Sequence, residues 1–413
     1  MRFCWVIVPL VAMLALAALA FSATREVSQR LYDAIHLSPA AGESLALRNY
    51  VATTFDVARA RAPAILLDHA ERVVVAVPEG DSLLVRRYSR PGQLDDSFGV
   101  AGRLSLPAGR ANVAALLEQS NGRLIIVASE VIRHRTVESL EFVWVVTVAA
   151  LRPDGSTEEG FGTNGRFTSA CGSRQGAAGR PLAATLAPDD SIYIVCSSPS
   201  RMEVLRVPRD GSSEQRGAHG VAMSTEASAQ SNGTIRLLVD GTIVVALQNE
   251  AELTIIRSTP SGPSIQTFSK HGDCAPRPLI LGGGEVELFE CSGNAAQVVR
   301  YRTAPVARGT VVTSFALPRG ADVMDAIRDN FGGLVLVGSL ESAAGRHLFL
   351  ARYNSNGTVD SAFHDNGVLT VPEGGAGGNS IVSSHGTIVA SGVSVGSDSA
   401  DRVVVVWSKS QQP

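Results

Sequence analysis

The chain has 413 residues, of which 36 are Lys or Arg and 39 are Asp or Glu, so its net charge at pH 7 is −3. This near balance argues against a nucleic-acid-binding protein, which needs a basic surface. Gly is abundant, at 40 residues, and only 5% of the residues are aromatic. Two or three ordinary domains would fit this length, but a single repeat fold can also be this long.

The first 22 residues have the pattern of a secretory signal peptide. Arg2 supplies a positive charge, and the segment from Val6 to Phe21 is almost continuously apolar. The small residues Ala20 and Ser22 match a peptidase site, so we expect cleavage before Ala23 and export to the periplasm or the exterior. An uncleaved leader that serves as an anchor is the alternative. No later run reaches the roughly eighteen apolar residues of a membrane span.

Residues 23–44 predict a linker or a short helix, and residues 45–413 predict a single all-β domain. Within that domain, repeats follow one another at intervals of about fifty to sixty residues, a period typical of propellers, solenoids or arrays. Most blocks open with a short strand, a turn and a hydrophobic second strand, and a repeat unit then supplies strands three and four. Four antiparallel strands form the blade of a β-propeller. The seven blocks begin near Ala64, Ala111, Leu182, Gln230, Pro278, Asp322 and Asn379.

The repeat unit is defined by two glycines and a phenylalanine at fixed spacing. Counted from the first Gly, the Phe lies six positions on and the second Gly ten. A β-branched and apolar strand precedes the first Gly, which adopts a turn with positive φ at no steric cost. We expect the Phe to fill apolar space beneath the loop. The four copies are Gly92, Phe98 and Gly102; Gly155, Phe161 and Gly165; Gly262, Phe268 and Gly272; and Gly357, Phe363 and Gly367.

Charged residues recur around these glycines. An Arg lies five residues before the first Gly in several copies, for example Arg87 and Arg352, and acids such as Asp95, Glu158 and Asp360 follow it by three. We expect the Arg to stack on the Phe of its own unit or to pair with the acid. The acids also loosely resemble a calcium loop, but each unit offers too few of the oxygen ligands that calcium needs. We therefore predict no cofactor, with calcium as the alternative.

The unit resembles the delta-60 repeat of bacterial exported and surface proteins, whose pattern is "aRyn-dG-slD-xxFG-x-nG". The resemblance is carried by the copies at Leu84–Leu104, Val148–Phe167 and Leu348–Leu369. It implies an exported propeller and no established activity.

The two ends of the repeat region are predicted to share one blade. The last block stops at Val403–Trp407, which is its third strand, and the strand-like Leu45–Val57 precedes the first block. An N-terminal strand that completes the last blade would close the ring and remove an exposed edge. We predict seven blades; six or eight blades and an open β-solenoid are the alternatives.

Four cysteines follow the leader, and an even number in an exported protein favours disulfides. Cys171 and Cys274 each follow a fourth strand, whereas Cys196 and Cys291 each end a second strand in the next block. These equivalent positions predict Cys171–Cys196 and Cys274–Cys291 bonds that join neighbouring blades. Four reduced thiols are the alternative, and the absence of a C-x-x-C pair argues against zinc.

No catalytic residue stands out. His219, His271 and His364 fall in equivalent loops, but they come from separate blades at different offsets, so we predict ordinary loop residues and no metal site. No Gly-x-Ser-x-Gly elbow stands at a strand-to-helix turn, and nothing selects a pair of glycosidase carboxylates. We predict an exported, monomeric binding or scaffold protein of the bacterial envelope or exterior, with a protein or carbohydrate partner on the propeller face. The alternative is a propeller hydrolase or lyase that acts on an extracellular polymer.

Overall fold

β-Strands are the only regular elements among the residues that the computed structural model describes, as the sequence predicts. These residues are 50–409 without 59, 110, 136–139, 172–179, 199–200, 217–221, 225–231, 250, 260–261, 271–275, 282–283, 293, 303–308, 343–344, 373–376 and 395–400. They all belong to one unit of the chain, Asn49–Pro413. The expected signal peptide and linker lie outside the described residues.

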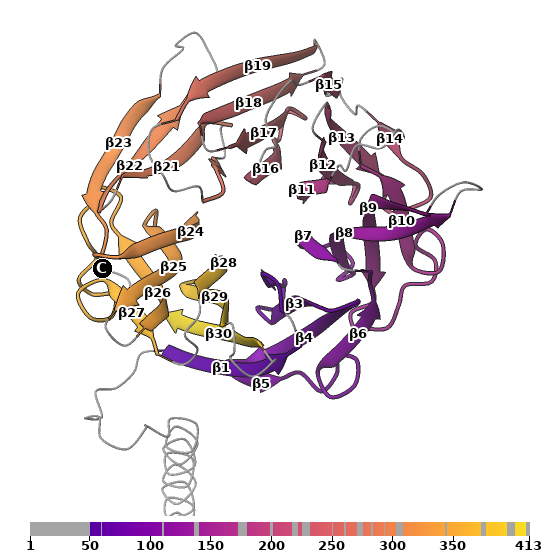
Figure 1. The fold of residues 1–413 in the computed structure, drawn as a ribbon, viewed down its shortest axis with the longest axis horizontal. Coiled ribbons are helices and arrows are strands. Elements are labelled where there is room, and N and C mark those ends of the chain that lie inside the picture. The colour runs from indigo at the N-terminus through magenta and orange to yellow at the C-terminus, as the bar shows by residue number, and fades with distance from the viewer. Residues whose placement is uncertain are drawn as a thin grey trace, which may run out of the picture. The chain divides into compact units, whose positions relative to one another are not determined.

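The strands form seven antiparallel sheets, which surround a central axis as the blades of a β-propeller (Figure 1). The predicted blade number is confirmed. Blade 1 contains β2 (Ala64–Leu67), β3 (Val73–Glu79), β4 (Ser82–Arg90), β5 (Gln93–Leu94) and β6 (Arg103–Pro107); blade 2 contains β7 (Asn112–Glu118), β8 (Leu124–Arg135), β9 (Leu140–Leu151) and β10 (Arg166–Ala170); blade 3 contains β11 (Arg180–Leu186), β12 (Ile192–Ser198), β13 (Arg201–Val207), β14 (Gln215–Arg216) and β15 (Ala222–Ser224).

Three of the other four blades follow the same order, and the last takes its outer strand from the N-terminal part of the described chain. Blade 4 contains β16 (Asn232–Leu237), β17 (Ile243–Gln248), β18 (Glu252–Thr259) and β19 (Gly262–Ser269); blade 5 contains β20 (Leu279–Ile280), β21 (Val286–Ser292), β22 (Ala295–Tyr301) and β23 (Thr310–Ala316); blade 6 contains β24 (Ala321–Arg328), β25 (Leu334–Ser342), β26 (Gly345–Tyr353) and β27 (Val368–Val371); blade 7 contains β28 (Gly377–Ser384), β29 (Thr387–Ser394), β30 (Asp401–Lys409) and β1 (Tyr50–Val57).

Closure of the ring follows the predicted scheme. β1 pairs with β30 in antiparallel register, from Tyr50 opposite Ser408 to Val57 opposite Asp401. Phe55 and Val57 also pack against blade 1 in the same apolar cluster. The N-terminal strand therefore completes the last blade and seals its junction with the first, which leaves β30 without an open edge.

The core is divided among the blade junctions. Each of seven clusters of buried apolar side chains joins two adjacent blades. The second strands lie between two such clusters and are buried on both faces, which is why they are continuous apolar runs such as IVVALQ in β17. Outer strands such as β19 expose most of their residues.

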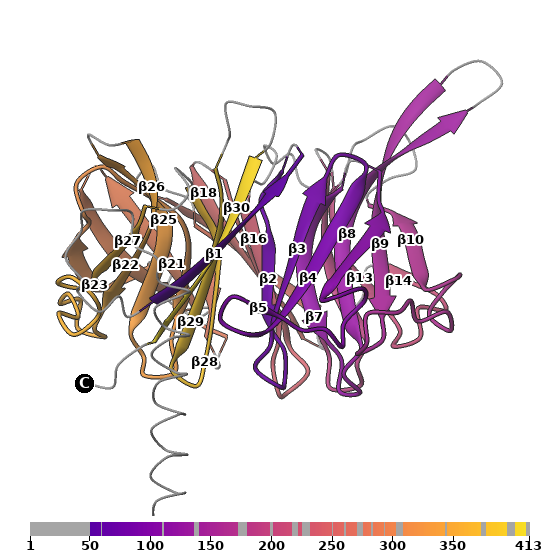
Figure 2. The same ribbon diagram turned by 90° about the horizontal axis from the view of Figure 1, so that it is seen from below.

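The turns define two faces of the ring. One face, here called the repeat-loop face, carries the turns between first and second strands and the loops between third and fourth strands. The other, called the hairpin face, carries the turns between second and third strands and the connections between blades. In Figure 2 the hairpin face is uppermost, with the β8–β9 hairpin extending from it.

The repeat loops adopt one geometry in three of the four copies. Phe98, Phe161 and Phe363 are at most 1% exposed, and each Phe N–H donates to the carbonyl of the acidic residue three positions before it at 2.9–3.0 Å. A Cβ atom on Gly155 would lie 3.0 Å from the ring of Phe98, and a Cβ atom on Gly211 would lie 2.8 Å from the ring of Phe161. The first Gly of one unit thus makes room for the Phe of the preceding unit.

The fourth copy differs from the expected loop. Gly262 and Phe268 both belong to β19, which pairs with β18 from Thr259 opposite Gly262 to Glu252 opposite Ser269. Because pairing resumes directly at Gly262, no loop separates this glycine from the strand. Gly272 lies outside the described residues.

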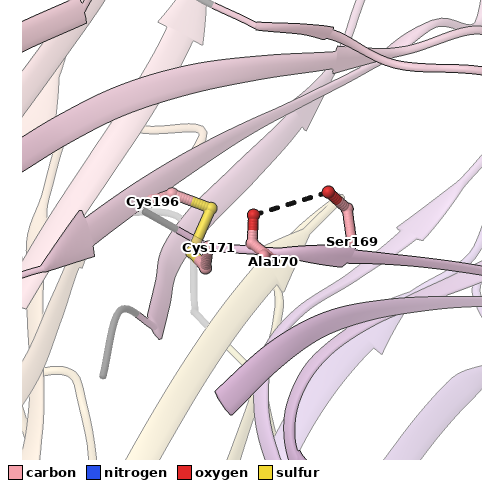
Figure 3. Close-up of a disulfide and its surroundings, with 4 residues drawn as sticks. All are labelled: Ser169, Ala170, Cys171 and Cys196. Carbon is pink, nitrogen blue, oxygen red and sulfur yellow. Dashed lines mark hydrogen bonds between the residues drawn. A yellow bond between two sulfur atoms is a disulfide. The ribbon is translucent and has the colours of Figure 1, made fainter. Parts of the chain in front are cut away.

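A disulfide joins blades 2 and 3, as predicted. Cys171 follows β10, Cys196 lies on β12, and their Cα atoms are 5.3 Å apart (Figure 3). Both side chains are buried in the cluster that these blades share. Cys291 is also disulfide-bonded. Its expected partner, Cys274, lies outside the described residues.

Candidate functional site

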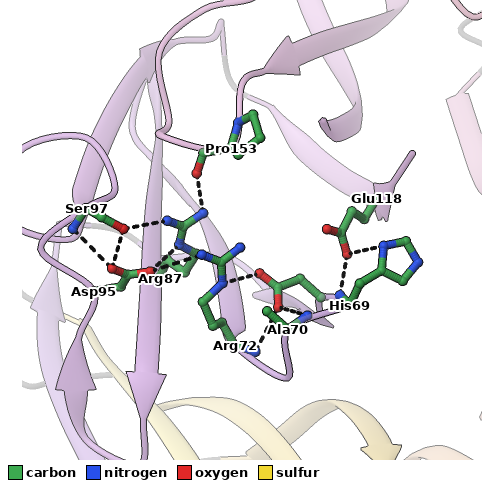
Figure 4. Close-up of polar contacts among 9 residues, drawn as sticks. His69, Ala70, Arg72, Arg87, Asp95, Ser97, Glu118 and Pro153 are labelled. Carbon is green, nitrogen blue, oxygen red and sulfur yellow. Dashed lines mark hydrogen bonds and ion pairs between the residues drawn. The ribbon is translucent and has the colours of Figure 1, made fainter. Parts of the chain in front are cut away.

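The recurring Arg residues stabilise the repeat loops. Arg87 Nε donates to Asp95 Oδ2 at 2.8 Å, and its guanidinium stacks on the Phe98 ring at 4.6 Å. Its Nη1 donates to the carbonyl of Pro153, which belongs to blade 2 (Figure 4). Both expected contacts of this Arg are therefore present, and a third contact ties the loop to the next blade.

The equivalent residue in blade 6 is Arg352, which is 2% exposed. Its Nε donates to Asp329 Oδ2 at 2.7 Å, and its Nη1 contacts the Asp360 carboxylate. Burial disfavours the charged guanidinium, but the hydrogen bonds with Asp329 and Asp360 outweigh it and raise the pKa of Arg352. The repeat acids Asp95 and Asp360 thus hold arginines.

The third candidate acid has other partners. Ala150 stands where the Arg would be, and Glu158 instead lies 3.5 Å from Arg123 and 3.6 Å from Arg152. Within the described part of the chain, no group of three His, Cys, Asp or Glu side chains could hold a metal ion.

One of the three predicted loop histidines, His364, lies within the described residues. His364 Nε2 lies 2.7 Å from Ser408 Oγ, and its ring packs edge-on against Phe363 at 4.6 Å. Burial lowers the pKa of His364, so the neutral imidazole is favoured and the side chain packs between blades 6 and 7. His219 and His271 lie outside the described residues.

Acids near the central channel tie blades together. Asp325 on the innermost strand of blade 6 accepts from Arg277 Nη2 at 2.6 Å and from the Ile381 N–H of blade 7 at 3.3 Å. Glu287 on β21 accepts from Arg300 of its own blade at 2.6 Å and from Arg328 of blade 6 at 2.9 Å. The ion pairs of Asp325 and Glu287 therefore give both buried acids a structural role.

A different arrangement occurs at the hairpin face, where blade 4 meets blade 5. A cavity of about 910 Å³, here called the blade 4–5 groove, is lined by Lys270, which follows β19, and by residues of β21, β22 and β23. Among the described residues, two charged side chains line it, and both are buried: Lys270 is 8% exposed and Glu290 is 2% exposed. The remaining lining residues are Cys291, Ser292, Asn294, Ala295, Ala296, Gln297, Ser314, Phe315 and Ala316.

Glu290 is held by neutral donors. Gln297 lies opposite it on β22, and Gln297 Nε2 donates to Glu290 Oε2 at 2.8 Å. Tyr301 Oη donates to Glu290 Oε1 at 3.1 Å, while the Tyr301 ring packs on Phe268 with 4.7 Å between centroids. Burial and the Glu290 charge raise the pKa of Tyr301, so its phenol stays protonated and serves as a donor. These two hydrogen bonds fix the carboxylate in place.

Lys270 reaches the groove from blade 4. It follows β19 directly, and its backbone N–H donates to the Ala251 carbonyl at 2.8 Å, which anchors the chain where the strand ends. Only two of the chain's 36 Lys and Arg residues are lysines, Lys270 and the exposed Lys409.

Sequence reasoning did not single out the groove. Lys270, Glu290 and Tyr301 lie in the blocks where the repeat is weakest, and no motif connects them. The one available signal was the rarity of lysine in a chain rich in arginine.

Comparison with known proteins identifies no family for the chain. No family model matches it, and no curated protein matches it. Among solved structures, a virginiamycin B lyase from Staphylococcus aureus is similar at 14% identity and a TM-score of 0.49, covering 86% of this chain and 99% of that one. A polysaccharide lyase is similar at 11% identity and a TM-score of 0.46, covering 90% and 92%. YCF48 from Cyanidioschyzon merolae is similar at 10% identity and 0.48, covering 86% and 98%.

The described residues contain no helix of the length and apolarity that a membrane crossing requires.

Proposed function

We propose that this chain is an exported binding protein of the delta-60 repeat class, whose propeller is the scaffold for a small polar ligand in the blade 4–5 groove. The observation that carries this proposal is the pair of buried charges, Lys270 and Glu290, that line one cavity. Charged side chains at the wall of a cavity are the groups that orient a polar ligand by hydrogen bonds. The groove volume also falls within the roughly 300–1,000 Å³ of small-molecule sites.

The chemistry of the groove favours binding over catalysis. A lyase that used Tyr301 as a base would need the phenolate form of its side chain. The pKa of this phenol is raised, and its hydroxyl donates a hydrogen bond to Glu290. Glu290 and Gln297 form a fixed set of hydrogen-bonding groups, as recognition requires. The disulfides support export, because they form and persist in oxidising compartments.

The test is a ligand screen on protein purified without reductant. Saccharides, amino acids, peptides and nucleotides are compared by the shift in melting temperature, and each hit is then assayed for turnover. We expect hits that are bound unchanged and that lose their effect in Lys270→Met and Glu290→Gln. Lys409→Met and Glu159→Gln, at exposed positions, should leave the shift intact. Saturable turnover of a hit would instead support the hydrolase or lyase.

A further inference from the structure

The outer strand of blade 4 presents a long, regular edge. β19 is the last strand in its sheet, and it lies at the rim of the ring (Figure 1). Its eight residues include no charged side chain, and all of them pair with β18 without a register shift. Ile265, at the middle of the strand, is 47% exposed. An edge of this kind is a template for pairing with another strand.

The outer strands of the other blades carry features that discourage such pairing. β6, β10 and β27 have only four or five residues, and β14 and β15 have two and three. β23 has a register shift opposite Val298 and Val299, and β1 carries Asp56. Short strands, bulges and charges all hinder edge-to-edge contact. Of the outer strands that the structure describes, β19 alone combines eight residues with no charge and no register shift.

The backbone hydrogen bonds show which groups of β19 face outward. The N–H of Lys270, directly after the strand, donates to the Ala251 carbonyl of the same blade at 2.8 Å. In an antiparallel pair, residues alternate between those that bond to the partner strand and those whose N–H and C=O point to the other side. Counted back from Lys270, the residues that point away from β18 are Ser269, Thr267 and Ile265.

A second copy of β19 matches this edge about a two-fold axis through Thr267. In antiparallel pairing, Thr267 then faces its own counterpart, and Ile265 faces Ser269 of the other copy. The outward N–H and C=O groups of these three residues all find partners. The next outward residue, Pro263, has no N–H and lies beyond the paired stretch. Because β19 has no charged residue, the two strands bring no like charges together.

From this match we propose that two copies of the chain associate edge to edge through β19, about a two-fold axis at Thr267. Such an interface uses the same surface on both copies. The proposal replaces the monomer expected from the sequence. It does not depend on the ligand of the blade 4–5 groove.

Cysteine cross-linking tests the register. Facing residues of an antiparallel hydrogen-bonded pair have Cα atoms about 5.5 Å apart, which a disulfide can span. Thr267→Cys, purified without reductant, should therefore form a disulfide-linked dimer on a non-reducing gel. Ser264→Cys, an exposed position on the same strand, is the matched control and should not, because its counterpart lies several residues away along the paired strands. A mixture of Ile265→Cys and Ser269→Cys should cross-link more than either variant alone.

Edge substitutions test the contact without a cross-link. Thr267→Pro removes an outward N–H and no hydrogen bond to β18, and Ile265→Lys places a charge on the edge. In analytical ultracentrifugation, the wild type should show a dimer fraction that rises with concentration. Both variants should lose it and keep a melting temperature close to that of the wild type. Thr267→Val, which retains the N–H, should dimerise as the wild type does.

Two results would overturn the proposal. One is a wild type that sediments as a monomer at every concentration while Thr267→Cys cross-links no more than Ser264→Cys. The other is a dimer that persists in both edge variants, because its interface would then lie elsewhere on the molecule.

Discussion

At the residue scale, the buried arginines are the costliest positions to change. Arg352 holds two carboxylates that are 3% and 8% exposed. Arg352→Met leaves both acids buried without this partner, so we expect a loss of about 3–5 kcal/mol in the free energy of unfolding. Urea unfolding measures it.

The matched control is Arg402→Met, which removes a pair whose two side chains are 54% and 67% exposed. That substitution should cost less than about 1 kcal/mol. Equal effects of the two substitutions would show that burial does not set the strength of the pairs.

Aspartates in tight turns give the stability a pH dependence. Asp154, Asp210 and Asp240 accept the N–H two residues on at 2.9, 3.1 and 2.9 Å. Hydrogen bonds from Ser156, Ser212 and Thr242 lower their pKa values in the folded protein. Their contribution is complete above the unfolded pKa of about 4 and is lost as the pH falls through the lower folded values.

We therefore expect the free energy of unfolding to fall as the pH drops below about 4. The triple variant Asp154→Asn, Asp210→Asn and Asp240→Asn should show a shallower fall, because an amide oxygen still accepts the turn hydrogen bond but does not titrate. Glu159→Gln should keep the original slope. Denaturant unfolding at a series of pH values measures this, and an unchanged slope in the triple variant would contradict it.

At the element scale, the repeat loop connects neighbouring blades, because its Phe packs against the first Gly of the next unit. Gly211 and Gly241 both follow an Asp in a tight turn, with φ of 69° and 79°. A Cβ at Gly211 would lie 2.8 Å from the Phe161 ring, whereas at Gly241 nothing lies within 4 Å. Both Gly→Ala variants should lose about 1–2 kcal/mol to backbone strain, and Gly211→Ala about 1–3 kcal/mol more to overpacking.

Phe161→Leu in the Gly211→Ala background should recover part of the additional loss, because the smaller side chain relieves the contact. Thermal and urea unfolding of the wild type, of Gly211→Ala, of Phe161→Leu and of the double variant measure this coupling. Equal stability of the two Gly→Ala variants would mean that the Phe does not depend on the neighbouring glycine.

These loops could be predicted from the sequence because each local requirement selects one type of residue. Positive φ selects Gly, the apolar space selects Phe, and the Arg selects an acid. Spacing alone was not sufficient, since Gly262 and Phe268 share it and yet lie on one strand. The groove was not predictable, because Lys270 and Glu290 come to line one cavity only through the packing of two blades.

At the scale of the whole molecule, the ring of blades closes because β1 completes blade 7 by pairing with β30. Deletion of residues 23–57 removes β1 and uncovers the edge of β30, whose Val403, Val405 and Trp407 are at most 4% exposed. We expect aggregation or loss of cooperative unfolding, measured by gel filtration and circular dichroism. Deletion of residues 23–44 alone is the control and should leave the unfolding transition unchanged. A stable, monomeric protein without residues 23–57 would contradict the role of β1.

Blade number and closure could be predicted because a propeller repeats one pattern until the ring is complete, and a missing last strand shows where the first must go. The ligand site could not be predicted in this way. A site between blades depends on which side chains face the junction, and the repeat period does not record that.

A crystal structure of the protein soaked with the tightest-binding ligand of the screen tests the proposed function most directly. We expect the ligand in the blade 4–5 groove, within hydrogen-bond distance of Lys270 Nζ or the Glu290 carboxylate. Ligand density in the central channel or on the repeat-loop face, with the groove unoccupied, would contradict it.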